Sequence, residues 1–116
     1  MRETPALIAV TPVKAGREAE FEAFVQDVIV PAVQQARPHL TGMWQTVRPA
    51  LDQPSDGPPA YVFLFYGGAP ISDWDLETLL PAAYGDEEGA ERFREFVDFE
   101  DGQQTIYFLG GEVGST

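Results

Sequence analysis

Three side chains near the middle of the chain are suited to chemistry on an organic molecule. Trp44, Thr46 and Arg48 are spaced two residues apart, so they share one side of an extended strand. A tryptophan offers a stacking surface for a planar molecule, and a guanidinium can stabilise negative charge that develops on an oxygen. We therefore expect Trp44 and Arg48 to be catalytic and Thr46 to contact the substrate.

Proton transfer would need a further group, and the sequence offers a histidine and several tyrosines. His39 is the one histidine of the chain, with an ordinary pKa near 6.5 that suits a general base. Tyr61 is a second candidate for this catalytic role, and Tyr107 could donate a hydrogen bond to a substrate. Phe63 and Phe65 lie on the same strand side as Tyr61, and we expect them to line the substrate site.

Each of these residues also has a purely structural interpretation. His39 follows Pro38 at the end of a helix, where it could be a surface or capping residue. Trp44 could belong to the core, with Arg48 at the rim of the sheet paired with an acid. Tyrosines are common in strands for packing alone.

Composition excludes several classes of function. Seven Lys and Arg against nineteen Asp and Glu give a net charge of −12, which would repel the phosphates of nucleic acid and anionic membrane surfaces. The chain has no cysteine, so disulfides and thiolate metal sites are absent and a cytoplasmic location is expected. No run approaches the roughly 20 apolar residues of a membrane helix. No cofactor fingerprint or metal-site motif is present, so we expect neither a cofactor nor a metal.

The length of 116 residues predicts a single domain over residues 1–116, with its core at about residues 6–113. Apolar runs and turn signals place its elements. We expect strands at Ala6–Val13, Leu40–Arg48, Tyr61–Tyr66 and Gln104–Leu109. Between them we expect a helix from Arg17 to about Ala36 with either a kink at Pro31 or a break there into a shorter final segment, a Pro-rich hairpin loop at 49–60 and an interrupted helical region at 72–98. In that region Ser72 and Asp75 resemble a capping box, and Pro81 and Gly85 break the helix.

This order is β-α-β-β-α-β, which predicts an α+β domain of ferredoxin-like topology with a four-stranded antiparallel sheet. Both helical regions would cover one face of the sheet. The third strand, Tyr61–Tyr66, is apolar on both of its sides, so the other face also needs a cover. A second copy of the chain is the simplest cover, and we expect a homodimer in which Phe63 faces the partner.

The segment from Leu7 to Phe24 combines an apolar strand, Val13-Lys14-Ala15-Gly16 and an acidic helix with Phe21 and Phe24. This segment resembles the opening of the dimeric α+β barrel superfamily. The resemblance implies that two sheets pack into a barrel whose interior is the ligand site. The order of elements matches over nearly the whole chain, whereas the motif itself indicates a fold and no particular chemistry.

Members of this superfamily include cofactor-independent antibiotic-biosynthesis monooxygenases, haem-degrading monooxygenases, polyketide cyclases and EthD-like proteins. The chain departs from several of them. It has no asparagine, its histidine follows the first helix, and Ile29 stands where EthD-like proteins usually carry a histidine.

The resemblance implies a homodimeric barrel that performs cofactor-independent oxygenation or cyclisation of an aromatic or polyketide-like molecule. Trp44 would stack on the substrate, Arg48 would stabilise negative charge, and a tyrosine or His39 would move the proton. The alternative is a non-catalytic dimeric barrel of stress-responsive or uncharacterised type, which binds a ligand or only assembles. A third possibility is that the segment around Pro81–Gly85 forms a lid or a contact of a larger oligomer.

Overall fold

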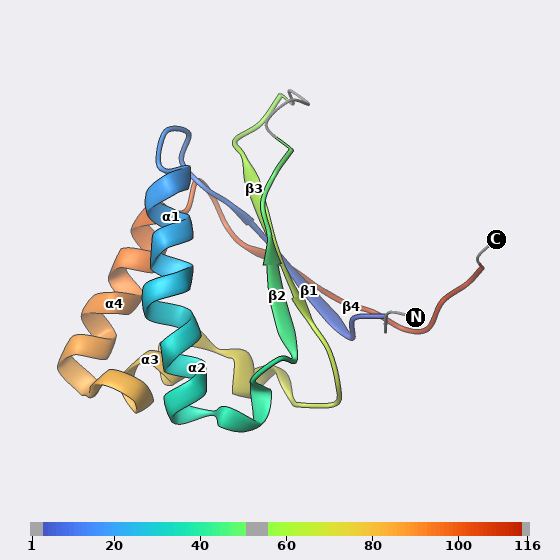
Figure 1. Ribbon diagram of the computed structural model, residues 1–116. Helices are drawn as coiled ribbons and strands as arrows, with labels where there is room; N and C mark the ends of the chain where they lie inside the picture. The colour runs from blue at the N-terminus through green and yellow to red at the C-terminus, as the bar shows by residue number, and fades with distance from the viewer. Residues whose placement is uncertain (1–3, 51–55, 115–116) are drawn as a thin grey trace.

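The computed structural model describes residues 4–50 and 56–114 as an open four-stranded antiparallel sheet with the helices on one face (Figure 1). The strands are β1 (Leu7–Pro12), β2 (Trp44–Val47), β3 (Ala60–Phe65) and β4 (Thr105–Phe108). The sheet order is β2-β3-β1-β4. The predicted α+β class and antiparallel sheet are confirmed, and the arrangement is compatible with a ferredoxin-like fold.

The first helical region is divided next to Pro31, as the predicted break into a shorter final segment requires. It consists of α1 (Glu18–Phe24), a π-helical turn η1 (Val25–Ile29) and α2 (Val30–Ala36). Pro31 has no amide hydrogen and its ring would collide with a carbonyl four residues earlier in an α-helix. The π-helical turn before Pro31 is wider than an α-helical turn and accommodates the proline. In this turn the Val30 amide donates to the Val25 carbonyl.

The second strand is shorter than predicted. Residues 38–40 form a 3₁₀ turn, η2 (Pro38–Leu40), and Gly42 has a φ of 79°, which only glycine adopts readily. The strand therefore begins at Trp44. Within the predicted loop 49–60, residues 51–55 lie outside the described part of the chain, and β3 already begins at Ala60.

The second helical region contains a 3₁₀ turn, η3 (Ile71–Trp74), followed by α3 (Leu76–Tyr84) and α4 (Asp86–Phe99). The expected cap at Ser72 is wrong, because the side chain of Asp75 caps α3 by accepting from the Glu77 amide at 3.1 Å. Pro81 lies inside α3 without ending it. The break comes at Gly85, whose φ of 92° ends the helix as predicted.

The register of the sheet decides which side chains face the helices. Antiparallel partners share a face, and Ala9 pairs with Phe63, which pairs with Thr46. Ala9 and Phe63 are buried under the helices within one chain. The expectation that Phe63 faces a partner copy is therefore wrong, because its side of β3 already packs in the core of the same chain.

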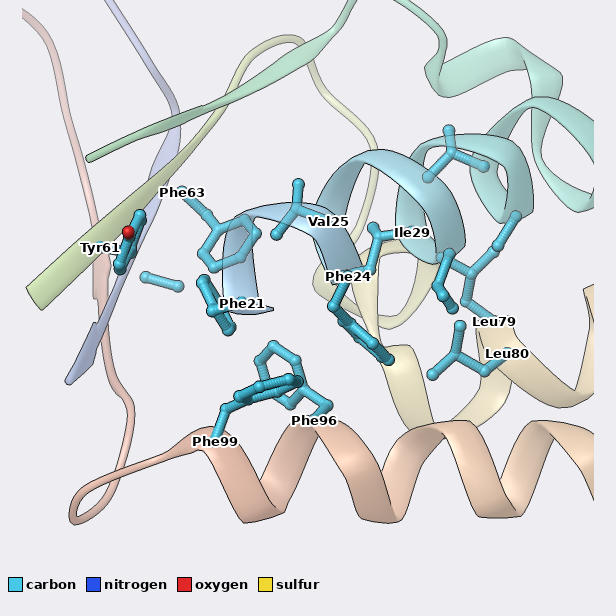
Figure 2. Packing of buried hydrophobic residues seen from close by; sticks show 14 of the residues in the cluster. Phe21, Phe24, Val25, Ile29, Tyr61, Phe63, Leu79, Leu80, Phe96 and Phe99 are labelled. Carbon is cyan, nitrogen blue, oxygen red and sulfur yellow. The ribbon is translucent and has the colours of Figure 1, made fainter. Parts of the chain in front are cut away.

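The core lies between the sheet and the helices, and aromatic rings dominate it. Figure 2 shows Phe21 of α1 between the sheet and α4. Its ring centroid lies 4.8 Å from that of Tyr61 and 5.6 Å from that of Phe99. Such tilted and edge-on pairs add to the burial of apolar area, so Phe21 connects the two layers.

The opposite side of the sheet, here called the open face, is bare in one chain (Figure 1). By register it carries Ile8, Val10, Pro12, Gln45, Val47, Ala60, Val62, Leu64, Thr105 and Tyr107. None of these residues is charged, although the chain has a net charge of −12. In the part of the chain that the structure describes, no helix has the length and apolarity needed to cross a membrane.

Candidate functional site

A cleft of about 840 Å³ lies between the helix-facing side of the sheet and the helical layer. The sheet contributes residues of β1, β2, β3 and β4, and the helical layer contributes residues from η1 to α4. Its lining includes Leu7, Ala9, Ile29, Val33, Trp44, Phe63, Phe65, Trp74, Leu76, Leu79, Phe93, Phe96, Val97 and Ile106. The side chains of the cleft are thus mainly apolar, as in many small-molecule sites.

Four aromatic side chains form a continuous wall along the cleft, here called the aromatic wall: Trp44, Phe63, Phe65 and Trp74. The ring centroids of Trp44 and Phe63 are 6.4 Å apart, and those of Phe63 and Phe65 are 6.3 Å apart, both with nearly parallel planes. The Phe65 and Trp74 centroids are 4.6 Å apart. The wall offers a planar molecule several ring faces in a row.

Trp74 belongs to η3, and a pair of side chains from the region after α2 holds this turn in place. Arg37 donates to the carbonyl oxygens of Ser72 and Asp73. The Nε2 atom of His39 lies 3.2 Å from Oδ2 of Asp73. His39 is exposed and is absent from the lining of the cleft, so the structure places it with the support of η3 and away from the aromatic wall.

Arg48 and Tyr61 also lie away from the cleft, in a cluster with Glu22. Arg48 donates to both carboxylate oxygens of Glu22, with Nη2 at 2.6 Å from Oε1 and Nε at 3.3 Å from Oε2. The Tyr61 hydroxyl donates to Oε2 of Glu22 at 2.6 Å. Burial and the carboxylate raise the pKa of Tyr61, which keeps the phenol protonated. In this cluster Arg48 and Tyr61 neutralise and orient Glu22.

Tyr107 and Thr46 have separate surroundings. Tyr107 pairs with Ile8 on the open face, so its ring points away from the cleft. Thr46 faces the helices and lines a second cavity of about 360 Å³ beside β2, together with Trp44 and Gln34. Its buried hydroxyl oxygen has no hydrogen-bond partner among the described residues. Of the eight predicted site residues, Trp44, Phe63 and Phe65 come together in the main cleft.

Of the described residues that line the cleft, two are charged, and both are acidic. Asp75 is engaged in capping α3, whereas Glu100 lies half-buried just after α4. Within residues 4–50 and 56–114, no hydrogen bond or ion pair reaches the Glu100 carboxylate. Burial raises the pKa of this carboxyl above its ordinary value. Glu100 is thus the acid of the cleft that is free to contact a ligand.

Two basic side chains, Lys14 and Arg17, pair with another acid, Asp98, near the end of α4. Arg17 donates to Oδ2 of Asp98 at 2.8 Å, and Lys14 Nζ lies 3.6 Å from Oδ1 of the same carboxylate. Arg17 also stacks on the ring of Phe99 at 4.4 Å. The positive charges of Arg17 and Lys14 lower the pKa of Asp98. Among the residues that the structure describes, the lining of the cleft includes no Lys, Arg or His.

Sequence reasoning missed Trp74 and Glu100 as residues of the site. Trp74 was expected only as part of the interrupted helical region at 72–98, and Glu100 only as part of the connection between that region and the last strand. A signal was present for Trp74, because the chain has only two tryptophans and both line the cleft. No local pattern marks Glu100, whose burial depends on the bridge between its strand-like backbone and Val13.

The described residues contain no group of three or more His, Cys, Asp or Glu side chains that could hold a metal ion. The polar residues that line the cleft include Ser72, Gln103 and Gln104. Gln104 Nε2 donates to Oγ1 of the buried Thr11 at 2.8 Å. A few polar groups in a mainly apolar lining suit hydrogen bonding to an organic ligand.

The cluster of Glu22, Arg48 and Tyr61 predicts how stability depends on pH. Hydrogen bonds from Arg48 and Tyr61 lower the pKa of Glu22 below its ordinary 4.5, so the stabilisation is complete above that value and is lost as the pH falls through the lower folded pKa. Glu22→Gln should therefore lower the free energy of unfolding by about 1 kcal/mol at neutral pH and by much less near about pH 3.

Urea unfolding followed by circular dichroism at the two pH values measures this difference. Glu91→Gln removes an exposed carboxylate from α4 and is the matched control, which should behave like the wild type. A Glu22→Gln penalty of equal size at both pH values would show that the cluster does not depend on the ionised carboxylate.

No family model, no curated protein and no solved structure that was searched matches this chain.

Proposed function

We propose that this chain binds an aromatic small molecule in the cleft between its sheet and its helices, with the ring system of the ligand against the aromatic wall. The observation that carries the proposal is the cleft itself, whose volume of about 840 Å³ falls in the range of about 300–1,000 Å³ for small-molecule sites. If the protein's own aromatic side chains filled the interior, a cleft of this volume would not remain.

The test uses anthrone, a neutral planar molecule, as the probe. Because both tryptophans line the cleft, binding should change the intrinsic tryptophan fluorescence. Trp74→Ala should weaken binding about tenfold, since it removes one stacking ring of the aromatic wall. Trp44 remains as the reporter in this variant.

Tyr84→Phe is the matched control, because Tyr84 is an aromatic residue of α3 that is absent from the lining of the cleft and donates to the Val28 carbonyl. It should bind anthrone as the wild type does. Failure of the wild type to bind anthrone, or an unchanged affinity in Trp74→Ala, would contradict the proposed site.

A catalytic use of the cleft is a second candidate, and Glu100 is the residue that favours it. Closing a ring in a polyketide-like molecule requires an acid or base beside the substrate, and a carboxyl with a raised pKa suits that task. Oxygenation with Arg48 as the oxyanion anchor has less support, because Arg48 is bound to Glu22 outside the cleft. Ring closure of a poly-ketone that Glu100→Gln abolishes would separate this enzyme from a binding protein.

We also infer that two copies pair through the open face. Its uncharged and largely apolar side chains would otherwise face water on a chain of net charge −12. A copy is the partner we favour, because two uncharged faces can meet without bringing the acidic residues of the two chains into the interface. A two-fold axis through the sheet would make the contact self-complementary.

A further inference from the structure

The distribution of charge around the cleft bears on the kind of ligand that it accepts. Within residues 4–50 and 56–114, its lining includes two charged residues, Asp75 and Glu100, and no basic side chain. The net charge of the whole chain has the same sign, at −12. The electrostatic potential in the cleft is therefore negative, and low-dielectric walls strengthen such a field.

Glu100 is the acid that can act on a ligand directly. The Asp75 carboxylate already accepts the Glu77 amide at 3.1 Å, whereas the Glu100 carboxylate has no partner among the described residues. Lys14 and Arg17 pair with Asp98, which lies two residues earlier in the chain than Glu100. An ionised, half-buried carboxylate without a partner is unfavourable, and a bound cation would relieve it.

The aromatic wall suits the same kind of ligand. The faces of Trp, Tyr and Phe rings attract ammonium groups, with tryptophan as the best of the three. The wall begins and ends with a tryptophan, and Trp44, Phe65 and Trp74 are only partly buried. The wall and Glu100 line the same cleft but lie toward opposite ends of β1, because Glu100 bridges to Val13 whereas Phe65 pairs with Leu7. A ligand that reaches both therefore needs a flexible alkyl chain between its ring system and its ammonium group.

We propose that the cleft selects a cationic aromatic ligand, an arylalkyl amine in its ammonium form, whose charge pairs with Glu100 while its ring system stacks on the aromatic wall. This inference rests on the proposed function, because it concerns the same cleft. It adds the class of ligand and assigns to Glu100 the role of a specificity-determining residue. A carboxylate or phosphate ligand of the same size would be disfavoured.

The experiment compares three probes of one shape by isothermal titration calorimetry at neutral pH, each a naphthalene ring on a long flexible alkyl chain that ends in an ammonium group, a hydroxyl group or a carboxylate. The wild type should bind the ammonium compound about fivefold to tenfold more tightly than the alcohol, and the carboxylate more weakly than the alcohol. In Glu100→Gln the ammonium and the alcohol should bind with affinities equal within about twofold.

Glu91→Gln is the matched control, because it removes one negative charge from an exposed position on α4 outside the cleft. It should keep the preference for the ammonium probe. Persistence of the preference in Glu100→Gln, or its loss in Glu91→Gln, would overturn the assignment to Glu100.

The outcomes also separate this inference from the proposed function. If all three probes bind the wild type with equal affinity, the cleft binds aromatic molecules but does not select cations, and the inference fails alone. If none of them binds, both fail. The three-probe comparison on the wild type decides the charge preference even if Glu100→Gln does not fold.

Discussion

Replacing Gly89 by alanine should lower the free energy of unfolding by about 2–4 kcal/mol. This sign is the reverse of the usual effect, because alanine in a helix interior is normally favoured over glycine by about 1 kcal/mol. Gly89 lies buried in the first turns of α4, against α3. A Cβ atom there would collide with the backbone N and Cα of Pro81 and would lie 2.6 Å from the carbonyl carbon of Leu80.

The penalty should be large because the obstacle is backbone. A flexible side chain could move aside, whereas a methyl group at residue 89 would have to push α3 away from α4. Such a shift would disturb Leu79 and Leu80, which are buried between these helices and the rest of the core (Figure 2). Leu79 also lines the cleft, so the variant should bind anthrone less well where it remains folded.

Chemical denaturation at neutral pH measures the effect. Gly68→Ala is the matched control, since a Cβ atom at this position would meet no other atom within 4 Å and Gly68 lacks a positive φ. Its stability should change little or rise slightly. A Gly89→Ala protein as stable as the wild type would mean that α3 and α4 do not approach as closely as the structure shows.

The sequence predicted the sheet and the helical layer because the spacing of apolar residues and the Gly and Pro residues between apolar runs are local signals. The apolar period of residues 17–36 and the aromatic run of residues 61–66 marked a helical region and a strand, and both are observed. The π-helical turn before Pro31 could not be read from the pattern, since it depends on how the helix accommodates the missing hydrogen bond. Likewise, nothing local shows that Asp75 rather than Ser72 caps α3.

The candidate site was harder to predict because it depends on which side of each strand faces the helices. A strand that is apolar on both sides, such as β3, gives no alternation from which to decide. Spacing correctly put Trp44 and Thr46 on one side of β2. It could not show that Arg48 and Tyr61 would be held by Glu22, or that Glu100 would come to line a cleft beside residues far away in the chain.

The two sides of β3 give the sharpest test of the proposed dimer. Leu64 lies on the open face, where it is the partner of Ile8 and Gln45, and Phe63 beside it is only 4% exposed beneath the helices. Leu64→Asp should give a folded monomer, because the charge disrupts the contact between copies but can be hydrated in a single chain. Phe63→Asp should unfold, because it buries an unpaired charge in the core.

The expected difference is large. Losing a core phenylalanine costs about 3–5 kcal/mol before the buried charge is counted, against a total stability of about 5–15 kcal/mol for a domain. Circular dichroism reports folding, and analytical ultracentrifugation reports mass. The wild type should sediment as a dimer, Leu64→Asp as a species of half that mass with unchanged secondary structure, and Phe63→Asp should lose its structure.

Ala23→Asp controls for the added negative charge, because Ala23 is exposed on α1, away from the sheet, and this variant should remain a dimer. A monomeric wild type at high concentration, or a dimeric Leu64→Asp, would contradict pairing through the open face. A folded Phe63→Asp would contradict the register of β3 instead. The pair of neighbouring substitutions therefore separates an error in the assembly from an error in the fold, which neither variant could do alone.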